Sequence, residues 1–147
     1  MGDDLWASIN GLYFEYCEAI NSHDRDRYAN TFCVDAVLES SGQPPMIGRD
    51  FIRSKVDLKK FGIQWLFQIP PRFHILDYAD GVARVRAYTV EVSQWNQKGN
   101  FYLSTYLDQC VVEDGAWRFK HRLGDILYSG SPDMMGERVT YPMPARY

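Results

Sequence analysis

The sequence predicts a single α+β domain in which N-terminal helices and a cone-shaped, curved antiparallel sheet enclose a pocket. Helical periodicity is confined to roughly the first 60 residues, and long strand-like segments fill residues 73–122. Three short links that contain glycine separate these segments. The length of 147 residues matches one domain, numbered 1–147, with an irregular tail from about residue 130.

The first helix is expected over residues 5–21, where apolar and aromatic residues recur every three to four positions. Asp24 can cap a second, short helix that ends near Phe32. Residues 35–40 predict a short strand, and the following Ser-Gly-Gln-Pro-Pro predicts a turn. A third helix is expected to begin at Gly48 and to end near Lys60.

The second half of the chain predicts an antiparallel meander. Strands are expected over residues 73–76, 81–95, 100–112 and 116–122. The links at residues 79–81, 96–99 and 113–115 are typical of hairpin turns. Because the helices come first and the meander follows, we expect the helices to cover one face of the sheet.

Composition excludes several classes of function. The net charge is −3 and the basic residues form no stripe, so we expect no nucleic-acid partner. Three scattered histidines and three isolated cysteines offer no metal-ligand spacing, and no metal is expected. No signal peptide or run of about 18 apolar residues is visible, so we expect no membrane association. The odd number of cysteines suits a reducing compartment, and we expect the protein in the cytoplasm.

An aspartate in the middle of a predicted strand is the most specific candidate for a functional residue. Asp108 lies between Leu107 and Gln109, although aspartate is disfavoured in strands. Strand alternation places it on one face with Tyr102, Ser104 and Tyr106, as in a polar and aromatic pocket wall. The alternative is an aspartate that faces solvent or forms an ion pair.

Tyr16 and Arg122 carry similar alternatives. Tyr16 lies on the apolar stripe of the first helix and is either a core tyrosine or a phenol that donates into the pocket. Arg122 is either a surface residue, a partner of Asp108 or a group that holds an anionic part of a substrate.

Several segments resemble enzymes of one superfamily. Tyr16-Cys-Glu-Ala-Ile-Asn-Ser-His-Asp, Phe32-Cys-Val-Asp-Ala-Val-Leu-Glu and Gly42-Gln-Pro-Pro-Met-Ile-Gly-Arg-Asp resemble the N-terminal half of ketosteroid isomerases. Residues 107–122 resemble the last strands of hexachlorocyclohexane dehydrochlorinase and of bile-acid and scytalone-type dehydratases. All belong to the SnoaL-like, nuclear transport factor 2-like superfamily, and the resemblance covers about residues 5–125. This fold hosts several reactions and also pure binding modules.

The resemblance implies a cofactor-free reaction carried out by ionisable side chains in an apolar pocket. It places Tyr16 and Asp108 at the positions of acid or oxyanion donors, and Arg122 at a pocket arginine. The standard base is absent: the helix position that carries aspartate in the dehydratases is Asn21, and residues 67–70 contain no histidine. Glu39 and His74 remain as candidate bases.

Two hypotheses follow. In the first, the protein is a lyase or isomerase, with a polyketide cyclase as a variant, that acts on a hydrophobic cyclic or aromatic small molecule. Tyr16 and Asp108 would donate, and Glu39 or His74 would be the base. The second hypothesis is a domain of the same fold that binds small molecules or partners without catalysis.

The remaining candidates concern the pocket wall and a protein partner. The expected pocket wall comprises Arg122, Tyr102, Tyr106, Leu38, Tyr88 and Trp65. A homodimer is expected through the open face of the sheet, where alternation places Trp117 and Phe119, with Trp95 nearby.

Overall fold

The computed structural model describes residues 2–132, with side chains from residue 4 onward. The elements in this range are α1 (Gly2–Asn21), α2 (Arg25–Asn30), β1 (Phe32–Ser40), β2 (Met46–Ile47), α3 (Arg49–Lys55), β3 (Ile63–Gln68), β4 (Arg72–Ala79), β5 (Val82–Trp95), β6 (Lys98–Glu113) and β7 (Ala116–Gly130). The predicted α+β class is confirmed. The tail expected to be irregular lies almost entirely outside the described residues. No helix in the described range is long and apolar enough to cross a membrane.

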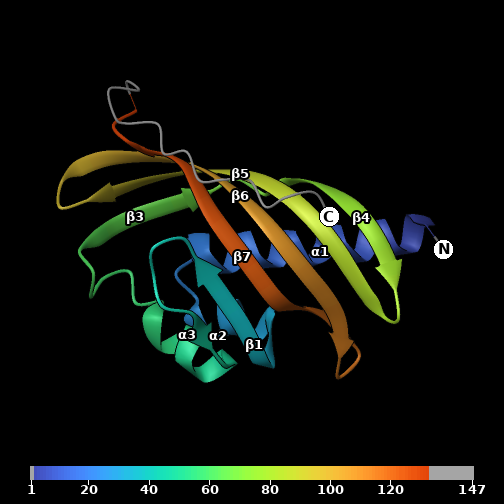
Figure 1. The fold of residues 1–147 in the computed structure, drawn as a ribbon. Coiled ribbons are helices and arrows are strands. Elements are labelled where there is room, and N and C mark those ends of the chain that lie inside the picture. Colours follow the sequence, from blue (N-terminus) through green and yellow to red (C-terminus); the bar gives the residue numbers. More distant parts are fainter. Residues whose placement is uncertain (1, 133–147) are drawn as a thin grey trace.

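The predicted stripe of the first helix is its buried face. Ile9, Leu12, Tyr13, Tyr16 and Ile20 are all buried, at the three- and four-residue spacing that keeps side chains on one side of a helix. Figure 1 shows α1 running along one face of the curved sheet, with α2 and α3 beside β1. The main core therefore lies between α1 and the concave face of the sheet.

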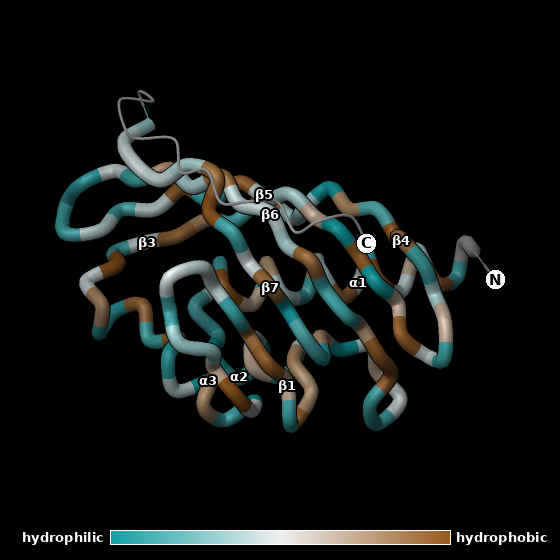
Figure 2. The backbone as a smooth tube through the Cα atoms, viewed as in Figure 1, coloured by the Kyte–Doolittle hydropathy of each residue, from teal (hydrophilic) through white to brown (hydrophobic). Residues whose placement is uncertain are grey.

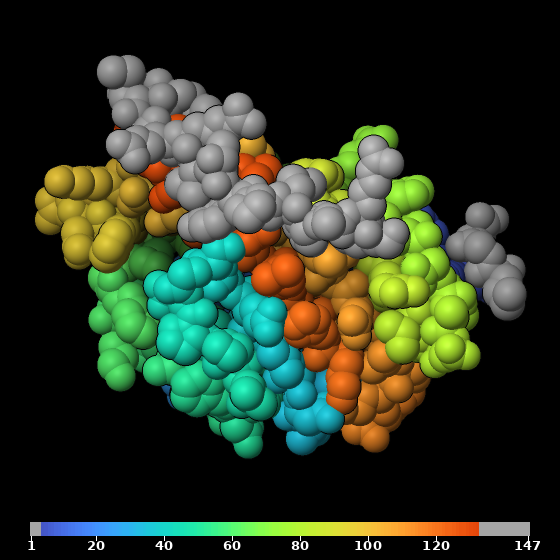
Figure 3. All heavy atoms as spheres, in the orientation of Figure 1, coloured from blue at the N-terminus to red at the C-terminus, as the bar shows by residue number. Residues whose placement is uncertain are grey.

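The seven strands form one sheet in the order β2-β1-β7-β6-β5-β3, and β4 also pairs with β5. Consecutive long strands pair antiparallel, as predicted, but β1 runs parallel to β7. The whole meander separates these two strands in the sequence, and only such a long connection allows a parallel neighbour. Figure 3 shows β1, β7 and β6 side by side on the face turned away from α1.

Three tight turns set the register of the meander. The residue pairs at these turns have positive φ angles, as type I′ hairpins require: Asp80–Gly81, Asn96–Gln97 and Asp114–Gly115. Each lies within a link where the sequence predicts a hairpin. In Figure 2 the turns between β5 and β6 and between β6 and β7 are hydrophilic, as solvent-exposed turns should be.

A bulge in β7 corrects one prediction. Residues Gln109 and Cys110 of β6 pair with His121 and Phe119, so Lys120 is an extra residue in β7. The extra residue brings Phe119 onto the same face as Arg122, and both are fully buried. The prediction that Phe119 lies on the open face of the sheet is therefore wrong, because simple alternation does not count the bulge.

Among the other differences from the predicted boundaries, two bear on the site. The third helix ends at Lys55 rather than Lys60, and β3, which the sequence did not predict, follows it. In β3 only Leu66 and Gln68 are buried, so Gln68 faces the core although it is polar.

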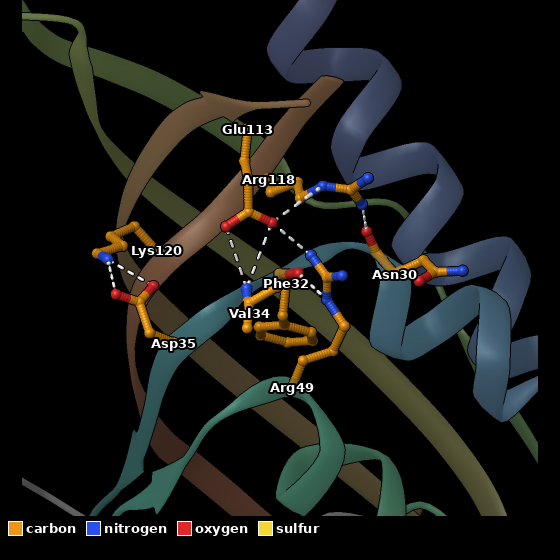
Figure 4. Close-up of polar contacts among 8 residues, drawn as sticks. All are labelled: Asn30, Phe32, Val34, Asp35, Arg49, Glu113, Arg118 and Lys120. Carbon is orange, nitrogen blue, oxygen red and sulfur yellow. Dashed lines mark hydrogen bonds and ion pairs between the residues drawn. The ribbon is translucent and has the colours of Figure 1, made fainter. Parts of the chain in front are cut away.

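A polar cluster attaches the start of β1 to the hairpin of β6 and β7 (Figure 4). The Glu113 carboxylate accepts a hydrogen bond of 3.1 Å from the Val34 amide and pairs with Arg49 at 2.5 Å. Arg49 also donates to the Phe32 carbonyl at 2.7 Å, and Arg118 donates to the Asn30 carbonyl. These contacts fix β1 beside β7, which positions one wall of the cleft described below.

Candidate functional site

A buried ion pair lies at the centre of the concave face. Asp108 and Arg122 are register partners on β6 and β7, and neither has exposed surface. Arg122 donates from Nε to Oδ1 at 2.9 Å and from Nη2 to Oδ2 at 2.8 Å. The Tyr13 hydroxyl also donates to Oδ2. A bidentate arginine with an extra donor is the geometry that offsets the desolvation of a buried carboxylate.

Aromatic rings enclose this pair. The carbon atom of the Arg122 guanidinium lies 3.9 Å from the ring centre of Phe119, 4.2 Å from that of Tyr106 and 4.4 Å from that of Tyr16. Burial, and then the charge of Asp108, raise the pKa of Tyr13 well above its ordinary value, so Tyr13 remains a donor. Asp108 is thus an acceptor for two neighbouring side chains, a role that suits an architectural charge rather than a neutral oxyanion donor.

A cleft of about 220 Å³ opens beside this core. It is lined by residues of β1, β5, β6 and β7: Ser40, Glu91, Tyr102, Ser104, Tyr106, Gly124, Asp125 and Ile126. Gly124 is needed here because a Cβ atom at this position would lie 3.2 Å from Cε1 of Tyr106. The missing side chain lets the Tyr106 ring lie against β7, between the cleft and Arg122.

Glu91 gives the cleft an ionisable group near neutral pH. Burial raises the pKa of Glu91 from 4.5 to about 7. Glu91 forms no ion pair in the described part of the chain. Its Oε2 accepts a hydrogen bond of 3.3 Å from Nε2 of Gln68, its register partner on β3. A carboxylate with this pKa can accept a proton at neutral pH, as a general base must.

Gln68 connects Glu91 to Tyr106. Its Nε2 also donates to the Tyr106 hydroxyl at 3.3 Å, while its Oε1 lies 3.6 Å from Sγ of Cys17. The Asn21 side chain binds the Gln68 backbone at both N–H and C=O, at 2.6 and 2.9 Å. No described residue accepts a hydrogen bond from the Tyr106 hydroxyl, so its proton is available for a ligand. Burial raises the pKa of Tyr106 well above its ordinary value, so the hydroxyl stays protonated.

The structure brings together only some of the residues that the sequence proposed. Tyr102 and Tyr106 line the cleft, as expected for the pocket wall. Asp108 and Arg122 lie one layer deeper, and Leu38 is the register partner of Arg122 on β1. Tyr16 is also buried in the core, where its hydroxyl lies 3.3 Å from that of Tyr28.

Other proposed residues lie away from the cleft. Glu39 pairs in register with Leu123 and lies 3.5 Å from Nε2 of His121, on the opposite face from Leu38. His74 is exposed on β4, and its register partner on β5 is Arg86. Tyr88 and Trp65 are about half exposed, because they alternate with buried neighbours in β5 and β3. Neither proposed base, Glu39 nor His74, is therefore brought to the pocket.

Sequence reasoning missed Tyr13, Gln68 and Glu91. A signal existed for Glu91, because it alternates with the apolar and small residues Val85, Ala87 and Thr89 on one face of a predicted strand. No such signal existed for Gln68, because β3 was not predicted.

Three larger hollows lie elsewhere on the described surface. The first, of about 510 Å³, lies between the α1–α2 turn and residues 56–59. The second, of about 410 Å³, lies beside Trp6 and Phe73, and the third, of about 400 Å³, lies between α1 and Trp117. None is lined by a tyrosine, so none places a carboxylate beside tyrosine hydroxyls, and the smaller cleft is the stronger candidate site. No group of three or more possible metal ligands occurs among the described residues.

Comparisons with known proteins agree with this architecture. The family model described as a SnoaL-like domain matches residues 5–123. No curated protein matches the chain significantly.

Solved structures with the same fold share little sequence with the chain. A scytalone dehydratase-like protein from Novosphingobium aromaticivorans has a TM-score of 0.82 at 17% identity, covering 100% of both chains. Hexachlorocyclohexane dehydrochlorinase type 3 from Novosphingobium barchaimii has a TM-score of 0.74 at 14% identity, covering 95% of this chain and 96% of the other. ActVI-ORFA from Streptomyces coelicolor has a TM-score of 0.70 at 19% identity, covering 83% and 97%. At these identities the likeness establishes the fold.

Proposed function

The chain belongs to the SnoaL-like domain family, and from that premise we propose that it is a cofactor-independent lyase or isomerase acting by proton transfer on a small cyclic molecule. The family hosts several chemistries and also binding modules, so the reaction has to be argued from the site. The named relatives with this fold include a dehydrochlorinase and a scytalone dehydratase-like protein.

The carboxylate of Glu91 is the observation that carries the proposal. It lines the cleft, no cation neutralises it within residues 2–132, and burial raises its pKa to about 7. Within the described residues only Oε2 accepts a hydrogen bond, from Gln68, so Oε1 is available there to take a proton from a ligand. General bases work best when their pKa lies near the operating pH, and they contribute roughly 10²- to 10⁴-fold in rate.

Tyr106 supplies the complementary acid. Glu91 would remove a proton from a carbon next to a carbonyl or a leaving group. Tyr106 would donate its hydroxyl proton or a hydrogen bond to the oxygen that gains negative charge. In an isomerase Glu91 returns the proton to another carbon. In a lyase the C–H electron pair forms the double bond, the leaving group departs with the proton of Tyr106, and exchange with water then moves the proton from Glu91 back to Tyr106. Glu91 therefore takes the role for which the sequence suggested Glu39 or His74.

Deuterium exchange tests this proposal without knowledge of the natural substrate. A panel of cyclic ketones is incubated with the protein in D₂O near neutral pD, and loss of the α-protons is followed by NMR. We expect exchange above the buffer rate, reduced roughly 100-fold or more in Glu91→Gln. Glu18→Gln, the same change at an exposed position on α1, is the matched control.

The outcomes separate the candidate functions. Equal exchange by the wild type and Glu91→Gln would remove Glu91 as the base, and loss of exchange in Glu39→Gln would restore Glu39. Ligand binding without any exchange would favour the second candidate, a binding domain. The pairing of Asp108 with Arg122 supports the binding domain, because an Asp108 that is held as an acceptor is not available as the acid that the family resemblance suggested.

Two further properties are proposed for the protein, its cellular compartment and its oligomeric state. Cys17, Cys33 and Cys110 are buried free thiols, which suits a reducing cytoplasm. We further propose a homodimer, with an exposed apolar row made by Trp65, Phe67 and Ile69 in place of the buried Phe119.

A further inference from the structure

Among the described residues, the cleft presents the acidic side chain of Glu91 and no basic side chain. Among the eight lining residues in the described part of the chain, Glu91 and Asp125 are acidic and none is Lys, Arg or His. Asp125 accepts a hydrogen bond from the Ser41 hydroxyl and pairs in register with Thr105, so its side chain lies on the other face of β7 from the Tyr106 ring. An anionic ligand in this cleft would approach the Glu91 carboxylate without a cation to compensate.

The buried Arg122 does not supply that cation. Two of its nitrogens bind Asp108, and the Tyr106 ring lies 4.2 Å from its guanidinium carbon. Arg122 is fully buried and is absent from the cleft lining. The sequence-based idea that Arg122 holds an anionic substrate group is therefore not supported by the placement of its charge.

Hydroxyl groups are the other feature of the lining. The side chains of Ser40, Tyr102 and Ser104 make no hydrogen bond within residues 2–132, although all three line the cleft. Tyr106 adds a fourth hydroxyl, which accepts from Gln68 and has no acceptor for its own proton among the described residues. These groups suit a ligand that carries several oxygen atoms and can exchange hydrogen bonds with them.

The volume of the cleft suits a ligand with one ring. An engineered apolar cavity of about 150 Å³ accommodates benzene, whereas pockets for drug-sized ligands measure about 300–1,000 Å³. At about 220 Å³ this cleft has room for a single ring with small substituents.

We propose that the cleft binds an uncharged single-ring compound bearing two or more oxygen atoms, and that Glu91 excludes the corresponding anions. This inference rests on the proposed function, because it names the substrate class of the same site. The preference for uncharged ligands is measured as a binding affinity, whereas the proposed reaction is measured as proton exchange. The two proposals can therefore fail separately.

Two ring compounds that differ in charge provide the test. 4-Hydroxybenzyl alcohol and 4-hydroxybenzoate share the ring and the phenol, and only the second is an anion at pH 8. Each is titrated into ¹⁵N-labelled protein, and the amide shifts of Tyr102, Ser104 and Tyr106 are followed. We expect the alcohol to bind at millimolar concentration in the cleft and the benzoate to bind at least tenfold more weakly.

Substitution of Glu91 identifies the source of the selectivity. Glu91→Gln should narrow the difference in affinity between the two compounds, whereas Glu18→Gln should leave this difference unchanged. Equal or tighter binding of the benzoate by the wild type would overturn the inference, as would the absence of any shift at the cleft with the alcohol. If the selectivity holds but Glu91→Gln keeps proton exchange, the ligand class stands and Glu91 is removed as the base of the proposed reaction.

Discussion

Asp108 and Arg122 face each other across β6 and β7 with no exposed surface on either side chain, and they are joined by two hydrogen bonds of 2.9 and 2.8 Å. Asp108→Asn would leave the Arg122 charge buried without its counter-ion. We expect this change to lower the free energy of unfolding by about 3–5 kcal/mol, measured by urea denaturation.

A double variant serves as the control for this prediction. Asp108→Leu combined with Arg122→Met removes both charges and should recover most of the stability. Asp35→Asn, in an exposed pair with Lys120, should change little. If Asp108→Asn kept wild-type stability but lost proton exchange, Asp108 would be a reactive group rather than an architectural one.

Glu91 should make stability depend on pH. The unfolded side chain loses its proton near pH 4.5, whereas the pKa of folded Glu91 is about 7. The folded state therefore holds more protons between these values, and its stability falls as the pH rises through this window. Glu91→Gln should raise the free energy of unfolding by about 1–3 kcal/mol at pH 8 and by much less near pH 4.5. Urea denaturation at both pH values checks this, and equal effects of the substitution at both would contradict the assigned pKa.

Gln68 should control the ionisation of Glu91. Its amide donates to the Glu91 carboxylate, and a donor of this kind favours the charged form. Gln68→Leu should therefore raise the pKa of Glu91 further, seen in a ¹³C NMR titration of the carboxyl carbon and as a shift of the proton-exchange profile to higher pH. Gln109→Leu, the same change at an exposed position on β6, is the control. An unchanged titration in Gln68→Leu would show that this hydrogen bond does not position Glu91.

Gly124 should be intolerant of a side chain. A Cβ atom there would lie 3.2 and 3.3 Å from two carbon atoms of the Tyr106 ring, which would have to move. Gly124→Ala should cost about 1–3 kcal/mol of stability and weaken ligand binding. Gly11→Ala has open space in α1 and should instead stabilise the protein by about 0.5–1 kcal/mol. Thermal denaturation of both variants compares the signs, and stabilisation by Gly124→Ala would contradict the assigned packing.

The exposed row on β3 should mediate self-association. Trp65, Phe67 and Ile69 are 46%, 53% and 50% exposed, and a dimer would remove this surface from water. Sedimentation velocity at micromolar concentration should give about twice the chain mass of 17.1 kDa, and Phe67→Asp should give the monomer. A wild-type protein that sediments only as a monomer would reject the homodimer.

Local patterns were sufficient for much of the fold. The apolar stripe of α1 predicted its buried face, and the Asp-Gly pairs at residues 80–81 and 114–115 marked two hairpin turns, because both features depend on neighbours within a few residues. Strand alternation also placed Tyr102, Tyr106 and Asp108 on one face, where the structure has them.

Long-range contacts decided the rest. The bulge at Lys120 moved Phe119 into the core, and the parallel pairing of β1 with β7 turned Glu39 away from the cleft. Neither can be read from local periodicity, because a bulge and a parallel neighbour depend on strands far away in the sequence.

The sequence by itself determined the α+β class, the helical face and the aromatic strand face on which the candidate site is built. Only the tertiary structure decided which ionisable group serves that site. It paired Asp108 with Arg122, and it placed Gln68 of β3 beside Glu91 of β5, 23 positions further along the chain. The pKa and the availability of a carboxylate depend on burial and on the partners within hydrogen-bond distance, and these are set when distant segments pack together.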